Sequence, residues 1–223
     1  MDDISVLIYS CDAYSDVWKP FFTLLFRYWK CPYPVYISTE TEECTHAGVK
    51  TITHEADTWT ERIGYAVRQI PTKYVIGMCE DMFMRRPVKH DVIKQCAQRM
   101  EENPDIACFN FEKDYDGAVG DVFGKKPPGN NYKKSCQPTL WRRDVLMELL
   151  DCRMSAWEWE MSPAPEYYDY YIYTGDPDEV VFDYGYRFGQ WFGIQKGKWV
   201  AQDIIPLFNR EEISIDLRHR GLI

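Results

Sequence analysis

Apolar positions in the first half of the chain follow two patterns, short continuous runs and longer stretches with helical spacing. The runs are rich in β-branched residues and predict strands at residues 4–9, 35–38, 49–53, 74–79 and 106–111. Such runs are typical of strands that are covered on both faces, as in a parallel sheet. The stretches between them predict helices over 17–29, 58–70 and 92–100. Strands and helices in this order indicate an α/β domain with a mostly parallel sheet.

Local signals mark the ends of the second helix and the start of a further one. Thr58 and Glu61 form a capping box, in which the Thr58 hydroxyl accepts from a helical amide and Glu61 reaches back. Pro71 ends that helix, because proline lacks the amide hydrogen that a helix interior needs. Ser155 and Glu158 have the same spacing, so we expect a helix to begin there too.

The second half of the chain has a weaker pattern. Residues 112–134 contain four Gly, two Pro and two Asn, which predicts a long loop. Loops of this length inside a compact domain are usually functional. A helix is expected over 143–150 and a short amphipathic helix over 210–218. Residues 167–173 are aromatic and irregular, and 182–199 is typical of a strand or loop interrupted by glycines.

Length, charge and hydropathy narrow the class of protein. The chain has 223 residues and a net charge of −9, which argues against a nucleic-acid binder because such a protein needs a basic face. The longest apolar stretch, residues 20–26, ends at Arg27 and falls well short of the roughly 20 residues that a membrane span needs. No repeat or linker interrupts the sequence, so we expect a single domain over residues 1–223.

The N-terminus and the cysteines indicate a compartment. The chain begins Met1-Asp2-Asp3, which is acidic where a secretory signal is basic. None of its eight cysteines has CxxC or another zinc-ligand spacing, and several lie in apolar runs. We therefore expect reduced thiols and a cytoplasmic protein.

Polar side chains directly follow two of the predicted strands. The first strand ends at Ser10-Cys11-Asp12 and the fourth at Glu80-Asp81. In an open parallel sheet, ligands bind beyond the carboxyl ends of the strands. Adjacent carboxylates suit a divalent metal that also holds a diphosphate, because they offer hard oxygen ligands and leave positions open for phosphate. A solvated turn is the alternative interpretation of the acidic pair.

Three segments resemble a known family. Residues 60–86 resemble the core of bacterial GT-A glycosyltransferases, where an Arg-bearing helix and a strand precede a short acidic motif, here Cys79-Glu80-Asp81. Residues 137–144 and 155–160 are similar to the paired Q-P-x-x-W-R and W-E-x-E motifs of bacterial surface-polysaccharide glycosyltransferases. A third match is Gly197-Lys198-Trp199, so the resemblance spans residues 4–199. The chain departs from the family where Glu stands first in the acidic pair and Met82 follows it.

This resemblance implies a GT-A fold, a Rossmann-like mixed sheet flanked by helices. Residues 1–111 would form the nucleotide-binding half and 112–223 the acceptor-side half. The implied reaction moves a sugar from a nucleotide-diphosphate donor, in particular a UDP-sugar, to a saccharide or lipid-linked acceptor in cell-surface polysaccharide synthesis. Mn²⁺ or Mg²⁺ would be the cofactor. Such a protein would work in the cytoplasm and associate with the inner face of the membrane at most peripherally.

The resemblance also implies roles for single residues. The donor would be bound by Ser10, Asp12, Arg62, Glu80, Lys198 and Arg220. The metal ligands would be Asp81 and His219. Asp12 would hold the uracil or the ribose, and the alternative is a turn residue at a helix entry. Arg62 would reach the diphosphate or the donor sugar, and the alternative is a surface ion pair with Glu55 or Asp57. For His219 and Arg220 the alternative is a solvated helix end.

Glu158 and Glu160 are the candidates for the catalytic base. An inverting transferase needs a carboxylate that takes the proton from the acceptor hydroxyl. Two residues apart in a helix, their side chains point about 200° apart, so both cannot meet one hydroxyl. The capping box uses Glu158, and we therefore expect Glu160 to be the base. The neighbouring Trp157 and Trp159 can stack on sugars or fill the core. The donor sugar, the acceptor, the stereochemistry and the oligomeric state are left open.

Two other functions fit the expected fold. A sugar-1-phosphate nucleotidyltransferase would have a Gly-rich, basic phosphate loop directly after its first strand. This chain has Ser10-Cys11-Asp12-Ala13-Tyr14 there, which argues against that function. A non-catalytic sugar-nucleotide-binding module of the same fold stays open as the alternative to an enzyme.

Overall fold

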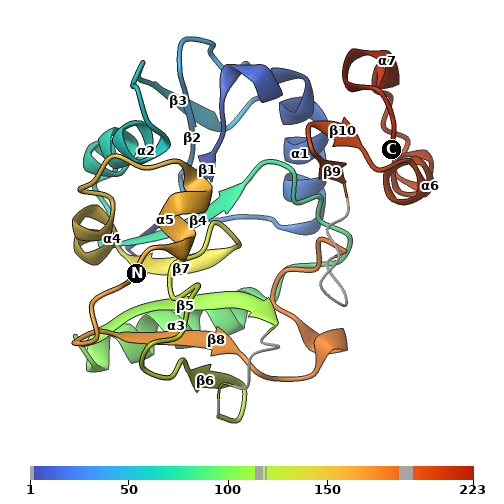
Figure 1. The fold of residues 1–223 in the computed structure, drawn as a ribbon. Helices are drawn as coiled ribbons and strands as arrows, with labels where there is room; N and C mark the ends of the chain where they lie inside the picture. Colours follow the sequence, from blue (N-terminus) through green and yellow to red (C-terminus); the bar gives the residue numbers. More distant parts are fainter. Residues whose placement is uncertain (1–2, 114–117, 119, 186–192) are drawn as a thin grey trace.

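A computed structural model describes residues 3–113, 118, 120–185 and 193–223, and its centre is one mixed sheet (Figure 1). Its eight strands, counted within these residues, lie in the order β3-β2-β1-β4-β7-β5-β8-β6. Their bounds are β1 Ile4–Tyr9, β2 Val35–Thr39, β3 Val49–Thr53, β4 Tyr74–Cys79, β5 Ile106–Lys113, β6 Phe123–Lys125, β7 Thr139–Arg142 and β8 Asp169–Tyr173. Strands β3, β2, β1 and β4 pair in parallel, as do β5 and β8, whereas β7 and β6 are antiparallel to their neighbours.

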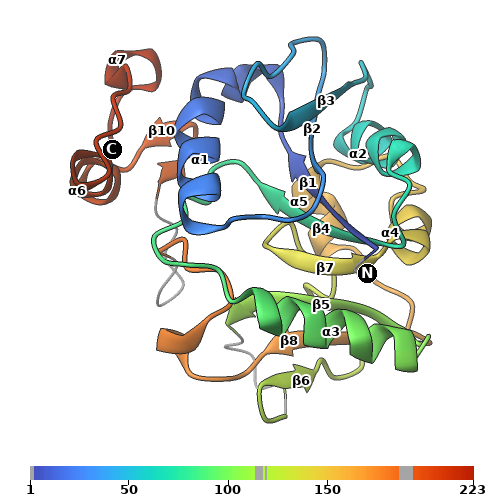
Figure 2. The same cartoon turned by 180° about the vertical axis from the view of Figure 1, so that it is seen from behind.

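Helices cover both faces of the sheet. Figures 1 and 2 show α1 (Ser15–Tyr28) and α3 (His90–Glu102) on one face, where they share a core with one side of the strands. The other face carries α2 (Trp59–Gln69), α4 (Arg143–Leu149) and α5 (Ala156–Met161). The protein is thus a single α/β domain with a mostly parallel, Rossmann-like sheet between helical layers, as the sequence predicts.

The C-terminal segment packs beside α1 (Figure 1). It consists of a hairpin of β9 (Ile194–Gln195) and β10 (Lys198–Trp199), then α6 (Ala201–Arg210) and α7 (Leu217–Arg220). The Phe208 ring of α6 contacts the rings of Phe83 and Trp199, and this contact attaches the segment to the core. Two short 3₁₀ helices, η1 (Asp12–Tyr14) and η2 (Pro177–Glu179), complete the elements of the described chain.

Strand β1 shows why a continuous apolar run suits this sheet. Val6 and Ile8 enter the core under α1, whereas Leu7 and Tyr9 enter the core under α2. Tyr9 lies so close to Gly77 of β4 that a methyl group at position 77 would overlap the phenol ring. The glycine therefore leaves room for an aromatic ring at the carboxyl end of β1.

The first five predicted strands and both capping boxes are confirmed, with ends shifted by two residues at most. Residues 167–173, predicted as irregular, instead contain β8. The predicted loop 112–134 contains β6, and its residues 114–117 and 119 lie outside the described part. The predicted strand or loop 182–199 contains the β9–β10 hairpin, and its residues 186–192 also lie outside the described part.

The predicted helix over 210–218 is wrong. Arg210 is the last residue of α6, and the next helix, α7, begins only at Leu217. Glu212 has a φ of 56°, and this left-handed conformation interrupts the helical path. Helix α6 was missed because Pro206 in its interior is a strong break signal, although its apolar stripe is buried.

In the described residues, no helix combines the length and the apolar character that a membrane crossing requires.

Candidate active site at the carboxyl ends of β1 and β4

The two predicted polar strand ends are neighbours. Strand β1 lies between β2 and β4, with Tyr9 paired to Cys79, so Ser10 and Glu80 both follow at the same edge. The chain passes from β1 to β2 on one side and later from β3 to β4 on the other side, and open α/β sheets bind their ligands at such a switch point. The sequence located both polar strand ends, and the structure adds that Ser10 and Glu80 are neighbours.

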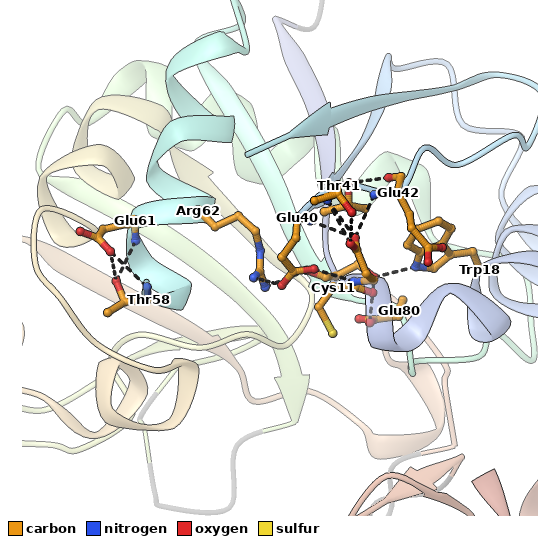
Figure 3. Close-up of polar contacts among 12 residues, drawn as sticks. Cys11, Trp18, Glu40, Thr41, Glu42, Thr58, Glu61, Arg62 and Glu80 are labelled. Atoms are coloured by element: carbon orange, nitrogen blue, oxygen red, sulfur yellow. Dashed lines mark hydrogen bonds and ion pairs between the residues drawn. The ribbon is translucent and has the colours of Figure 1, made fainter. Parts of the chain in front are cut away.

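A buried hydrogen-bond relay holds Glu80 in place (Figure 3). The indole Nε1–H of Trp18 donates to Ser10 Oγ over 2.7 Å, and the Ser10 hydroxyl donates to Glu80 Oε1 over 2.9 Å. Glu80 is 5% exposed and Ser10 is 4% exposed. The relay uses one carboxylate oxygen of Glu80 and orients the side chain at the strand end.

The acidic pair is short of positive charge. Burial, and then the charge of Asp81, raises the pKa of Glu80 from 4.5 to about 8. Burial also raises the pKa of Asp81 from 3.8 to about 6, and the Arg220 guanidinium opposes both shifts. Arg220 acts on the Asp81 carboxyl through its charge, while its own hydrogen bonds go to Asp16 and Ala13. Binding of a proton or of a cation stabilises a site of this kind.

The acidic pair suits a divalent cation that is also coordinated by phosphate. Mg²⁺ and similar ions are commonly held by one or two carboxylates and by the phosphates of the substrate. Glu80 and Asp81 provide two such carboxylates at the ligand edge. No group of three or more His, Cys, Asp or Glu side chains lies close enough in the described residues to form a metal cage. The donor set thus suits a cation that arrives with a diphosphate.

Arg220 reaches this edge from the far end of the chain. Its Nε–H donates to Asp16 Oδ2 over 2.8 Å, and its Nη2 donates to the Ala13 carbonyl over 2.6 Å. The guanidinium lies 4.1 Å from the ring centroid of Tyr14. Its charge also acts on the Glu80 and Asp81 carboxyls. The structure therefore brings the charge of Arg220 near the acidic pair, while donor binding by Arg220 stays a prediction.

Arg62 also points into the edge, which Figure 3 shows. Its Nη2 donates to the Ser10 carbonyl over 2.9 Å, and its Nη1 pairs with the Glu40 carboxylate. The alternative of a surface ion pair with Glu55 or Asp57 is wrong, because Arg62 is 8% exposed and turns inward. Its charge is balanced by Glu40, a partner that no sequence pattern indicates.

Asp12 holds the loop after β2. Its carboxylate accepts from the backbone amides of Glu40, Thr41 and Glu42 and from the Thr41 hydroxyl. Burial alone would raise the pKa of Asp12, but these hydrogen bonds lower it. These contacts support the alternative of a structural turn residue. Binding of the base or the ribose by Asp12 stays a prediction.

Helix α5 separates the two candidate bases as expected. Glu158 Oε2 accepts from the amide and the hydroxyl of Ser155, which completes the capping box on the solvent side. Glu160 points the other way and accepts from the Cys136 amide over 2.6 Å. Burial raises the pKa of Glu160, whereas the contacts with Ser155 lower the pKa of Glu158. Of the two carboxylates, Glu160 therefore has the higher affinity for a proton.

The Glu160 carboxylate and the acidic pair share a neighbour. Cys136 interacts with the Cys79 thiol, which lies directly before Glu80, and feels the charges of both Glu160 and Asp81. Cys136 lies three residues before β7, the antiparallel strand beside β4. This strand brings α5 and β4 to one edge, a juxtaposition that the sequence order does not reveal.

Lys198 and His219 lie apart from the acidic pair in the described part of the chain. Lys198 is exposed in β10, and His219 is exposed on α7. His219 lines a cavity of about 300 Å³ together with Asp16 and Asp216. No contact between either side chain and the acidic pair occurs in the described residues, so donor binding by Lys198 and metal binding by His219 stay predictions.

The sequence did not identify two residues that lie at the carboxyl ends of β1 and β4. Glu40 neutralises Arg62, and Tyr14 supports the Arg220 guanidinium. The pKa of Tyr14 is raised by burial and then by the charges of Asp81 and Glu80. For Tyr14 the sequence does offer a signal, because it is an aromatic residue that closely follows the polar end of a strand. For Glu40 there is no such signal, because its ion pair joins two residues that are far apart in the sequence.

Comparisons with known proteins identify no family. No family model matches the chain, and no curated protein does. Among solved structures it is similar to the bifunctional IspDF from Campylobacter jejuni, with a TM-score of 0.43 and 9% identity over 68% of this chain and 44% of that one. The chain thus spans less than half the length of that protein.

Two further solved structures are similar at the same level. One is a cytidylyltransferase from Leptospira borgpetersenii, with a TM-score of 0.40 and 11% identity over 72% of this chain and 68% of that one. The other is 4-diphosphocytidyl-2C-methyl-D-erythritol synthase, with a TM-score of 0.45 and 10% identity over 85% and 93% of the two chains. Similarity at this level carries no statement about the substrate of this chain.

Proposed function

We propose that the protein is a glycosyltransferase of the GT-A type that binds a nucleoside-diphosphate sugar at the carboxyl ends of β1 and β4. The observation that carries the proposal is the pair of carboxyls at the end of β4. Glu80 and Asp81 are adjacent and lie at the end of the sheet where open α/β sheets bind ligands, and burial raises the pKa of both carboxyls, for Glu80 together with the charge of Asp81. Strongly perturbed carboxyls at such a position are typical of functional sites.

Charge balance explains why a diphosphate would need a cation here. Five carboxylates and two guanidiniums gather around the edge, namely Asp12, Asp16, Glu40, Glu80, Asp81, Arg62 and Arg220. Both guanidiniums already have a carboxylate partner. The protein as a whole is also acidic, with a net charge of −9. A diphosphate would therefore be repelled unless it entered with a divalent cation between itself and the acidic pair.

The residues of the edge divide into three tasks. Glu80 and Asp81 would hold the cation, and the Ser10–Trp18 relay orients Glu80. When it is bound, the cation supplies positive charge that stabilises the departing nucleoside diphosphate. Arg220, whose guanidinium lies over the Tyr14 ring and whose charge acts on the pair, would meet a phosphate oxygen.

Glu160 takes the proton of the acceptor hydroxyl in this proposal. Its raised pKa makes it a better proton acceptor than Glu158, which is fully used by the capping box. The Cys136 amide holds the Glu160 carboxylate in position. The acceptor is a saccharide or a lipid-linked saccharide at the cytoplasmic side of the membrane.

One observation favours a non-catalytic sugar-nucleotide-binding module as the second candidate. The Cys136 amide donates to Glu160 over 2.6 Å, and a short hydrogen bond to the charged form weakens a carboxylate as a base. In such a module the acidic pair would still bind the cation and the nucleotide. The two candidates therefore differ in turnover and not in donor binding.

Calorimetry of nucleotide binding tests the donor site. The titrants are UDP, GDP, CDP and CTP, each in EDTA and in Mn²⁺. We expect one diphosphate to bind much more tightly in Mn²⁺, and Asp81→Asn to abolish that difference. Asp169→Asn is the matched control, because Asp169 is half-buried but opens β8 at the opposite edge of the sheet. Equal affinity in EDTA and Mn²⁺, or an unaffected Asp81→Asn variant, would contradict the donor site.

Release of UDP from UDP-sugars then separates enzyme from module. Slow donor hydrolysis in the wild-type protein supports the transferase. Tight Mn²⁺-dependent binding without any release of UDP, over a panel of donor sugars and saccharide acceptors, supports the module instead.

A further inference from the structure

Two exposed aromatic rings meet at α5, the helix that carries Glu160. Trp157 is 65% exposed and Tyr132 is 37% exposed, and their ring centroids are 6.2 Å apart in an edge-to-face arrangement. Met161, one helical turn after Trp157, is 39% exposed. By contrast Trp159 is fully buried between Trp59 and Trp141. The rings of Trp157 and Tyr132 are called the aromatic platform below.

The backbone of Tyr132 is strained. Its φ is 58°, a left-handed conformation that costs a bulky residue of order 1 kcal/mol or more. Glycine or asparagine would adopt it at lower cost, and the chain places Asn130 and Asn131 directly before it. Strain of this kind persists only where the surrounding structure imposes it, and it concentrates at functional positions.

Three buried lysines impose this conformation on the loop. Lys126 donates to the Tyr132 carbonyl, Lys133 pairs with Glu166, and Lys134 donates to the Pro163 carbonyl over 3.1 Å. All three are at most 7% exposed. Burying three ammonium groups is costly, so a loop built in this way is held in one shape.

The platform is connected to the candidate base. Trp157 and Glu160 are three residues apart on α5 and therefore occupy neighbouring faces of the helix. The loop that holds Tyr132 continues to Cys136, whose amide binds Glu160, and the Lys126 charge acts on the Glu160 carboxyl. One short segment thus places both an exposed aromatic ring and the partner of the base.

We propose that Trp157 and Tyr132 form the acceptor subsite and bind a neutral sugar ring of a saccharide against their faces, next to Glu160. This inference rests on the proposed function and names the substrate class of its acceptor. Rigid aromatic side chains offer a large contact area at a small entropic cost, and the polar groups around Glu160 can meet hydroxyls.

A membrane is the competing occupant of exposed aromatic residues, and the charges around the platform argue against it. Lys126, Lys133 and Lys134 are buried, and Lys133 is paired with Glu166, so these three lysines present little positive charge to anionic headgroups. Glu158 and Glu160 lie on the same helix as Trp157 and would be repelled by such headgroups. A neutral saccharide meets no such repulsion.

The test measures saccharide binding directly, by saturation-transfer NMR and by titration of tryptophan fluorescence. The probes are neutral oligosaccharides of two to four glucose, galactose or N-acetylglucosamine units. We expect the wild-type protein to bind at least one of them, and Trp157→Ala to weaken that binding at least tenfold. Tyr132→Gly should do the same without loss of stability, because glycine accepts the left-handed backbone and removes the strain. Tyr167→Ala, which removes a 66% exposed ring elsewhere, should change nothing.

The outcomes separate this inference from the proposed function. Loss of saccharide binding in both variants, with Mn²⁺-dependent nucleotide affinity unchanged, supports the platform. Failure of nucleotide binding in the wild-type protein would remove the donor site but leave the saccharide result standing. The platform is overturned if no probe binds the wild-type protein or if the two variants bind as the wild type does. It is also overturned if Trp157→Ala loses binding to phosphatidylglycerol vesicles while no oligosaccharide binds.

Discussion

Replacing Glu80 by Gln should make the protein more stable at neutral pH. The pKa of Glu80 is raised from 4.5 to about 8 in the folded state, mainly by burial. Between these values the folded protein keeps a proton that the unfolded chain has lost, so stability falls as the pH rises through this window. Glutamine keeps the size of the side chain and the hydrogen bond from Ser10, but it has no proton to lose.

The magnitude follows from the width of that window. At pH 7 the wild-type protein is about 2.5 pH units above the unfolded pKa of 4.5, at about 1.4 kcal/mol per unit. The variant should therefore gain on the order of 3 kcal/mol at pH 7 and less than about 1 kcal/mol at pH 5. For a chain of 223 residues this corresponds to a melting temperature that is roughly 6–12 °C higher at pH 7.

The assay is thermal and urea unfolding in EDTA at half-unit steps from pH 5 to 8. Glu211→Gln is the matched control, because Glu211 is equally buried but has the opposite shift. Burial alone would raise the pKa of Glu211, yet hydrogen bonds from Tyr28, Arg27 and Arg210 lower it to about 2. That variant should lose stability at pH 7, and its deficit should narrow only as the pH falls toward 2.

Adding Mn²⁺ completes the experiment. The cation needs deprotonated carboxylates, so it should stabilise the wild-type protein at pH 7.5 and much less at pH 5. At a Mn²⁺ concentration 100 times the dissociation constant, the expected gain is about 2.7 kcal/mol. A Glu80→Gln variant that is less stable than the wild type at pH 7, or whose stability difference does not change with pH, would refute the charge argument for the acidic pair.

Four further predictions concern the fold and the roles of single residues. Gly77→Ala should lower the free energy of unfolding by about 1–3 kcal/mol in urea, since its methyl group overlaps the Tyr9 ring. Asp12→Ala should cost about 1–2 kcal/mol of stability in urea, because the carboxylate holds the loop after β2. Calorimetry with UDP tests its predicted second role: weaker UDP binding supports Asp12 as a nucleotide ligand, and unchanged affinity leaves only the structural role. Glu160→Gln should reduce sugar transfer about 10²- to 10⁴-fold at unchanged donor affinity. Glu158→Gln should cost about 0.5–1 kcal/mol of stability, and the reverse pattern would exchange the two roles.

The sequence was most informative where burial alone decides the structure. Strand β1 has apolar residues on both of its faces because helices cover both faces of the sheet, and the bounds of the strand agree with the prediction. The same pattern located the polar residues that follow β1 and β4. Helix starts were predictable as well, since a capping box is a local hydrogen-bond pattern.

Interactions between distant segments were not predictable. Arg220 pairs with Asp16 across 204 positions, and Arg62 pairs with Glu40. Strand β8 was missed because its residues are aromatic on both sides, with Tyr170 packed in the core and Tyr171 stacked on Phe109. These contacts depend on the tertiary arrangement, which overrides the local pattern.

Strand β7 connects the two halves of the candidate site. It runs antiparallel between β4 and β5, so the residues just before it arrive at the carboxyl end of β4. This reversal carries the Cys136 amide to Glu160 and the Cys136 thiol to Cys79. The two motifs that resemble surface-polysaccharide glycosyltransferases also meet here, since the Trp141 and Trp159 ring centroids are 6.0 Å apart. Their pairing in the sequence therefore has a physical cause: one motif builds the strand against which the other positions the candidate base.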